Sequence, residues 1–103
     1  MFTINGKEYD LHYTEARLEL IENRLGKSVI GEFISSNGAL PIASIKAHFA
    51  YALIDDENRD RFVPAKTGMD LASEYMREAG YAAANATISE CLQRDMGFLF
   101  RAG

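Results

Sequence analysis

The chain has 103 residues, of which 48% are apolar and 25% are charged, and its formal net charge is −4. A chain of this length and apolar content suits one folded domain with its own core, so intrinsic disorder is excluded. The chain has 11 basic and 15 acidic residues. This balance argues against binding to a nucleic-acid backbone, which needs a net basic surface.

Cysteine usage and apolar runs indicate the cellular compartment. Cys91 is the only cysteine, so no intrachain disulfide can form, as is typical of a reducing, intracellular setting. The first ten residues lack the basic and apolar regions of a signal peptide. No apolar run approaches the roughly 20 residues that a membrane span requires. We therefore expect a cytoplasmic protein that does not bind membranes.

Residues 2–13 have the pattern of a β-hairpin. Asn5-Gly6 is the strongest short hairpin signal, because a type I′ turn needs positive φ at both central positions. A two-residue turn sets Phe2 opposite Tyr9, and alternation then divides the side chains between two faces. The apolar face is expected to contain Phe2, Ile4, Tyr9, Leu11 and Tyr13. The opposite, polar face is expected to contain Thr3, Glu8, Asp10 and His12.

Helical periodicity predicts five helices after the hairpin, over residues 14–25, 28–35, 41–54, 68–79 and 81–94. Thr14 is the expected N-cap of the first helix and Gly26 its terminator. The helix over 41–54 is apolar around nearly its whole circumference, which predicts that it is buried, with Ile42 on its main apolar side. Residues 55–61 are expected to form a charged connection, and Thr67 with Asp70 a capping-box-like helix start.

Residues 96–100 form a short hydrophobic C-terminal tail, because continuing the last helix would place Asp95 in its apolar stripe. Two interpretations stay open. The tail either docks into a partner or a neighbouring subunit, or folds back over the hairpin and closes the core. The predicted fold is α+β and mostly α: one domain over 1–103, with the hairpin packed on four to five helices.

Three patterns imitate ligand sites. Gly26-Lys27-Ser28 resembles the end of a phosphate-binding loop, but Ile21 stands where that loop needs glycine. Residues 56–60 imitate a calcium loop, but the required glycine and the bidentate glutamate are absent. His12, His48 and Cys91 lack the spacing of a zinc site. We therefore expect no cofactor and no metal.

Ser44, His48 and Asp55 have the residue types of a hydrolase triad. Ser44 and His48 lie one turn apart on a predicted helix, and Asp55 lies about 10 Å further on, so the three side chains do not converge. No glycine-rich nucleophile turn surrounds Ser44. His48 is expected at an exposed helix edge or as a hydrogen-bonded histidine. The sequence therefore predicts that the protein is not an enzyme.

Apolar residues away from the main stripes are the candidates for partner binding. The candidate residues are Ala16, Leu20, Phe98, Leu99 and Phe100. The acidic row formed by Glu15, Glu19 and Glu22 is expected to face water, as charged rows usually do.

Two segments resemble a known family. The opening residues 2–9 (FTINGKEY) lead into a helix with Leu18, Ile21, Glu22 and Leu25, followed by Gly26-Lys27-Ser28. Together with the run of small apolar helices, this resembles the tail assembly chaperones of long-tailed bacteriophages and prophages, including those of gene transfer agents. The E-x-x-L-G-K-S segment and the hairpin are the parts that carry the resemblance.

The resemblance implies a non-enzymatic protein of the bacterial host's cytoplasm that is absent from the mature virion. Such a chaperone coats the long, helical tape measure protein and keeps it soluble. It helps recruit tail tube subunits, which displace it as they polymerise. Self-association is expected as well. The family has no catalytic residues to carry over to this chain.

An alternative is a small intracellular helical adaptor or regulatory protein, for example one that is antitoxin-like. A DNA reader would need a helix with basic residues in a row. Lys27, Lys46 and Lys66 are isolated from one another, so we expect no nucleic-acid partner.

Overall fold

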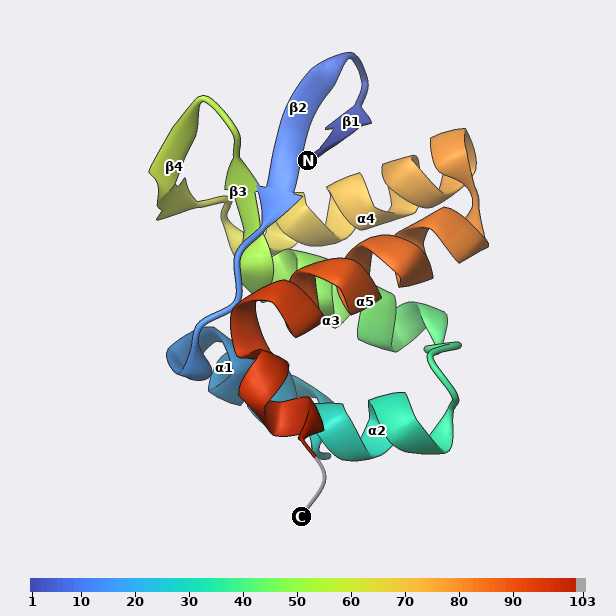
Figure 1. The fold of residues 1–103 in the computed structure, drawn as a ribbon. Helices are drawn as coiled ribbons and strands as arrows, with labels where there is room; N and C mark the ends of the chain where they lie inside the picture. Colours follow the sequence, from blue (N-terminus) through green and yellow to red (C-terminus); the bar gives the residue numbers. More distant parts are fainter. Residues whose placement is uncertain (102–103) are drawn as a thin grey trace.

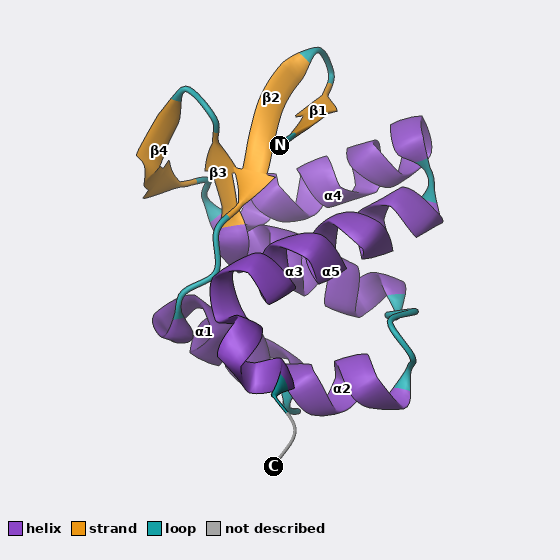
Figure 2. Ribbon diagram, viewed as in Figure 1, coloured by secondary structure: helices purple, strands orange, loops and turns teal. Residues whose placement is uncertain are grey.

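The structure, a computed structural model, describes residues 1–101 as one four-stranded sheet with five helices and a short 3₁₀ helix. The strands are β1 (Phe2–Ile4), β2 (Lys7–Leu11), β3 (Leu53–Asp55) and β4 (Asn58–Phe62). The helices are α1 (Glu15–Leu25), α2 (Val29–Ser35), α3 (Ile42–Ala52), α4 (Ala65–Ala79), α5 (Tyr81–Met96) and η1 (Gly97–Phe100). The sheet lies at one end of the molecule, and α1, α2 and η1 lie at the other (Figures 1 and 2). The predicted α+β, mostly α class is confirmed.

The first hairpin, β1–β2, has the predicted turn and register. Asn5 and Gly6 have φ angles of 52° and 77°, the positive values that a type I′ turn requires. Phe2 pairs with Tyr9 and Ile4 with Lys7. The apolar face is directed into the core, where Ile4 is completely buried. Local turn chemistry therefore determines this hairpin.

A second hairpin, β3–β4, stands where the sequence predicted the end of a helix and a charged connection. The third helix ends at Ala52, and Leu53–Asp55 pairs with β2 in an antiparallel ladder, for example Asp10 opposite Ile54. The prediction was wrong because it treated β2 as the edge of the sheet. An edge strand has unpaired N–H and C=O groups, and the chain leaving α3 satisfies them.

Helix α3 occupies the centre of the molecule and contacts α1, α4 and α5. Its buried residues are Ser44, Ile45, Ala47, His48, Phe49, Ala50 and Ala52. The predicted central, buried helix is confirmed. Ile42 was expected on the buried side but is 57% exposed. It lies in the first turn between exposed Pro41 and Ala43, before the part of α3 that the neighbouring helices cover.

Helix caps follow the sequence signals at α1 and α2. The Thr14 hydroxyl accepts a hydrogen bond from the Arg17 N–H at 3.2 Å, and Gly26 ends α1 with a φ of 70°. The Ser28 hydroxyl caps α2 by accepting from the Gly31 N–H at 3.0 Å. Short polar side chains satisfy the otherwise unpaired first N–H groups of a helix, which explains both starts.

Two other helix boundaries differ from the prediction. Helix α4 begins at Ala65 after Pro64, so Thr67 and Asp70 lie inside it rather than capping it. Pro64 is the N-cap, where its missing N–H leaves no helical hydrogen bond unmade. Helix α5 continues to Met96, because the Asp95 carboxylate accepts a hydrogen bond from the Tyr13 N–H at 2.9 Å. A carboxylate with such a partner can lie against the core.

Close packing of α3 on α4 depends on Gly68. A Cβ at this position would collide with the Phe49 carbonyl and lie 3.0 Å from the Ala50 Cα, and both are rigid backbone atoms. We predict that Gly68→Ala lowers the free energy of unfolding by about 1–3 kcal/mol, measured by urea denaturation.

The matched control is Gly97→Ala, at an α-helical backbone position where a Cβ meets nothing within 4 Å. This substitution should leave stability unchanged or raise it by about 0.4–1 kcal/mol. Equal effects of the two substitutions would contradict the packing argument.

Candidate functional site

The C-terminal tail forms η1 and folds back onto α1 and α2. The Phe100 ring meets the Phe33 ring edge to face, with 5.4 Å between their centroids. Leu99 and Phe100 are partly buried against the core. The β1–β2 hairpin lies at the opposite end of the molecule (Figure 1). The tail therefore does fold back, but over the helices rather than over the hairpin as predicted.

A groove of about 340 Å³ lies between α1, the start of α2 and η1. Its apolar lining consists of Leu18, Ile30, Phe98 and Leu99. Phe98 is 49% exposed, whereas Leu18 is buried and Leu99 partly buried. The groove thus contains a half-exposed aromatic ring next to side chains that pack against the core. This apolar surface is available for contact with another chain.

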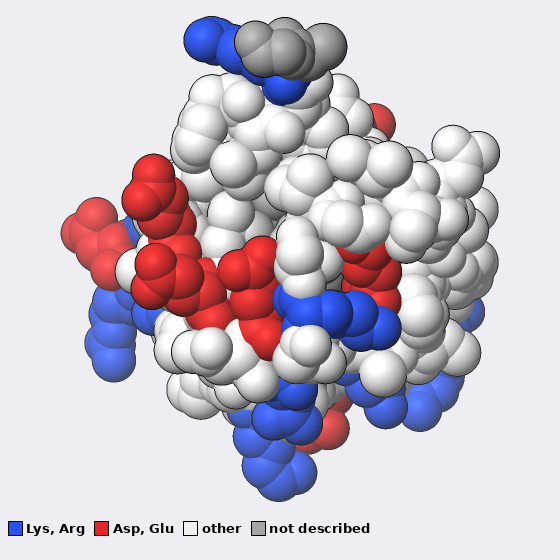
Figure 3. Space-filling view, turned by 90° about the horizontal axis from the view of Figure 1, so that it is seen from below, with Lys and Arg blue, Asp and Glu red and all other residues white. Residues whose placement is uncertain are grey.

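One wall of the groove is acidic and consists of Glu15, Glu19 and Glu22. Within residues 1–101, Glu15 and Glu19 form no ion pair, and both are exposed. Glu22 accepts a hydrogen bond from the Val29 N–H at 2.9 Å, so it also caps α2. Figure 3 views this end of the molecule and shows acidic side chains gathered on part of it.

The structure brings together only some of the predicted partner-binding residues. Phe98 and Leu99 line the groove, whereas Phe100 turns to α2. Ala16 and Leu20 are exposed, Leu20 by 41%, but the groove does not include them. The acidic row was expected only to face water, and its part in the groove was missed. The i, i+4, i+7 spacing of this row can be recognised in the sequence. The sequence does not show that η1 lies opposite the row.

Two of the three patterns that resemble ligand sites have structural roles. Gly26-Lys27-Ser28 joins two helices, and the Lys27 ammonium lies 2.7 Å from a Glu32 carboxylate oxygen. Asp56 and Glu57 form the turn of the second hairpin. Within residues 1–101, no three His, Cys, Asp or Glu side chains are grouped as metal ligands.

The triad-like residues do not converge. Asp55 lies in β3, with its carboxylate 2.8 Å from the Lys7 ammonium. His48 is 1% exposed, and its Nδ1 lies 2.7 Å from the Tyr13 hydroxyl. Burial lowers the pKa of His48 from 6.5 to about 4 and raises that of Tyr13 well above 10, so both are neutral at pH 7. Of the two predictions for His48, the hydrogen-bonded histidine is confirmed.

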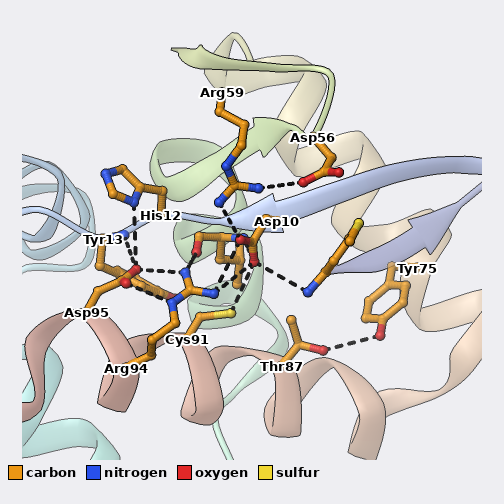
Figure 4. A network of polar contacts seen from close by, with 12 residues as sticks. Asp10, His12, Tyr13, Asp56, Arg59, Tyr75, Thr87, Cys91, Arg94 and Asp95 are labelled. Carbon is orange, nitrogen blue, oxygen red and sulfur yellow. Dashed lines mark hydrogen bonds and ion pairs between the residues drawn. The ribbon is translucent and has the colours of Figure 1, made fainter.

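Asp10, expected on the polar face of the hairpin, is buried in a polar network (Figure 4). Its carboxylate lies 2.8 Å from an Arg59 nitrogen and 3.3 Å from an Arg94 nitrogen, and its side chain is only 4% exposed. The sequence did not predict this burial, because it depends on β4 and α5 bringing these arginines over that face. Burial by itself would raise the pKa of Asp10, but Arg59 and Arg94 outweigh it and lower the pKa.

Arg94 extends the network to the chain leaving β2. Its guanidinium donates to the Leu11 carbonyl at 2.6 Å and to the Asp95 carboxylate at 2.8 Å. The pKa of Asp95 is lowered, since Arg94 and the Tyr13 N–H outweigh the effect of burial. The network joins β2, β4 and α5, and its members are paired with one another. This arrangement is typical of a network that stabilises the fold.

Comparisons with family models, with curated proteins and with solved structures found no match to this chain. No helix within residues 1–101 is both long and apolar enough to cross a membrane. The groove between α1 and η1 combines exposed apolar and acidic side chains.

From the Asp10 network we predict that the substitution Asp10→Asn lowers stability in one pH range only. Asp10→Asn should lower the free energy of unfolding at pH 7 by about 1–3 kcal/mol, because two arginines lose their buried anion. The pKa of Asp10 is lowered on folding, so its contribution is present above about pH 4 and disappears as pH falls through the folded-state value.

Denaturation of wild type and of Asp10→Asn at a series of pH values measures the difference in their free energies of unfolding. The control is Asp60→Asn, at an exposed position without an ion pair in the described part of the chain. A deficit in Asp10→Asn that persists unchanged at the lowest pH would argue against an electrostatic role.

His48 predicts a separate pH dependence. Its folded-state pKa of about 4 lies below the usual 6.5, so the unfolded chain binds more protons between these values. The contribution of neutral His48 to the free energy of unfolding should be fully present above pH 6.5. It should fall by about 3 kcal/mol as pH drops towards 4. In His48→Gln, which keeps an acceptor for Tyr13, denaturation curves from pH 7 to 4 should show a smaller fall. Identical slopes in the two proteins would contradict this assignment.

Proposed function

We propose that the protein is a non-enzymatic tail assembly chaperone of a long-tailed phage or prophage. It binds the tape measure protein, keeps it soluble and helps recruit tail tube subunits during tail morphogenesis. It acts in the cytoplasm of the bacterial host and is not retained in the mature virion. The resemblance of residues 2–9 and 22–28 to that family motivates this proposal.

The observation that supports it best is the placement of Phe98. The ring is 49% exposed although the segment that carries it is anchored by Leu99 and Phe100. An ordered, exposed aromatic side chain binds a partner without first losing conformational entropy. A protein that covers another chain's apolar surface needs such a rigid apolar feature.

Further exposed apolar side chains offer surface for self-association, which the proposal includes. Outside the groove, the side chains of Leu20, Ile42 and Tyr81 are exposed by 41%, 57% and 44%. They belong to different elements of the fold, so an oligomer has several apolar positions to use without covering the groove.

Co-expression with the tape measure protein of the same genome tests the function. Wild type should raise the soluble fraction of the tape measure protein several-fold and co-purify with it. Phe98→Ser should lose most of this effect, because it removes the half-exposed ring from the groove.

The matched control is Ile34→Ser, at a position that is 67% exposed and outside the groove. It should behave as wild type. Thermal unfolding of each variant shows that it is folded. No rise in soluble tape measure protein with folded wild type would refute the proposed function.

A further inference from the structure

We propose that the groove between α1 and η1 binds an amphipathic helix of the partner, with its apolar side on Leu18, Ile30 and Leu99 and lysine or arginine side chains facing Glu15 and Glu19. This inference rests on the proposed function, since it takes the groove as the site where the partner binds. It adds the secondary structure and the charge that the partner must have.

The acidic wall requires a basic partner. Glu15 and Glu19 are exposed and form no ion pair within residues 1–101, so their charges are available to a ligand. With Glu22 they form a row along one side of α1 that is about 10 Å long. Basic residues at i, i+3 or i+4 spacing on a helix lying along α1 would each meet one carboxylate.

The apolar floor requires an apolar stripe beside those basic residues. Leu18, Ile30 and Leu99 come from α1, α2 and η1, and half-exposed Phe98 borders them. A helix with leucine-like residues on one side and basic residues beside them fits both surfaces. Its apolar side contacts the apolar floor, and its basic residues face the acidic wall. Two helices packed side by side have axes about 8–10 Å apart, which brings long basic side chains within reach of the wall.

The occupant is a helix rather than an extended strand because helices border the groove. The interior backbone N–H and C=O groups of α1 are hydrogen-bonded within the helix. An extended peptide would find no sheet edge there and would leave its own backbone groups unpaired, whereas a helix satisfies its own. The acidic wall also repels nucleic-acid and lipid phosphates.

A second copy of this chain does not fit the groove. No helix within residues 1–101 carries two lysine or arginine residues three or four positions apart, and the whole chain has a net charge of −4. Like charges facing each other across an interface oppose association. The occupant is therefore a different chain with a basic, amphipathic segment.

A synthetic peptide tests this chemistry independently of any natural partner. The probe is a labelled, helix-forming peptide of about 20 residues with a leucine row flanked by lysines at i, i+4 spacing. A second peptide has glutamate in place of each lysine. Fluorescence anisotropy with the full chain should show binding of the lysine peptide at least tenfold tighter than of the glutamate peptide. High salt should weaken the difference.

Charge reversal locates the site. Glu15→Lys/Glu19→Lys should weaken binding of the lysine peptide by roughly tenfold to thirtyfold and should favour the glutamate peptide instead. Glu22 is left unchanged because it caps α2. Glu19→Lys alone should show a smaller effect in the same direction, which keeps the test valid if the double variant does not fold.

The control variant is Glu57→Lys/Glu90→Lys, which makes the same change of charge at exposed positions outside the groove. It should bind both peptides as wild type does. Equal affinity for the two peptides, failure of both to bind, or an equal effect of the control variant would each overturn the proposal. So would a homodimer, detected by light scattering, that Glu15→Lys/Glu19→Lys dissociates.

The co-expression assay separates this inference from the proposed function. If Glu15→Lys/Glu19→Lys solubilises the tape measure protein as well as wild type does, the groove proposal fails and the function stands. If the groove binds the lysine peptide but wild type does not solubilise the tape measure protein, the function fails and the groove proposal stands.

Discussion

Burial of α3 is the constraint on which the rest of the structure depends. This helix has apolar side chains around most of its circumference, so nearly every side of it has to be shielded from water. Helices α1, α4 and α5 do this by packing around it. Gly68 allows the backbone of α4 to approach the Phe49 carbonyl closely. The helices that surround α3 meet this requirement.

Apolar burial has no direction, so polar contacts determine how the sheet attaches to the helices. The Asp10 carboxylate, held between Arg59 and Arg94, links β2 to β4 and α5. Tyr13 adds a second link, since its N–H donates to Asp95 and its hydroxyl pairs with His48. Each of these buried groups would be costly without its partner, and this cost disfavours other arrangements of the same apolar surfaces.

The two ends of the molecule consequently differ. At the sheet end, the carboxylates of Asp10 and Asp55 are paired with basic groups, Asp55 with Lys7, whereas exposed Asp60 forms no ion pair within residues 1–101. At the other end, Glu15 and Glu19 form no ion pair with any residue that the structure describes, and they lie beside half-exposed Phe98. Unpaired charge next to exposed apolar surface is a feature of binding surfaces rather than of stabilising ones. In the function that we propose, the groove end of the molecule contacts the other chain.

The sequence by itself determined what depends on near neighbours. The turn at Asn5-Gly6, the caps at Thr14 and Ser28 and the buried character of α3 all arise from residues a few positions apart. Short-range sterics and helical periodicity are sufficient for such features. The resemblance to phage chaperones likewise rests on local segments.

Only the tertiary structure decided the features that join distant residues. Strand β3 exists because it meets β2, more than 40 positions earlier, and Asp10 is buried because Arg94 reaches it from α5. The groove forms only where Leu99 comes to lie against α1. A pattern read along the chain contains no information on which distant groups will become neighbours, since packing around α3 determines that.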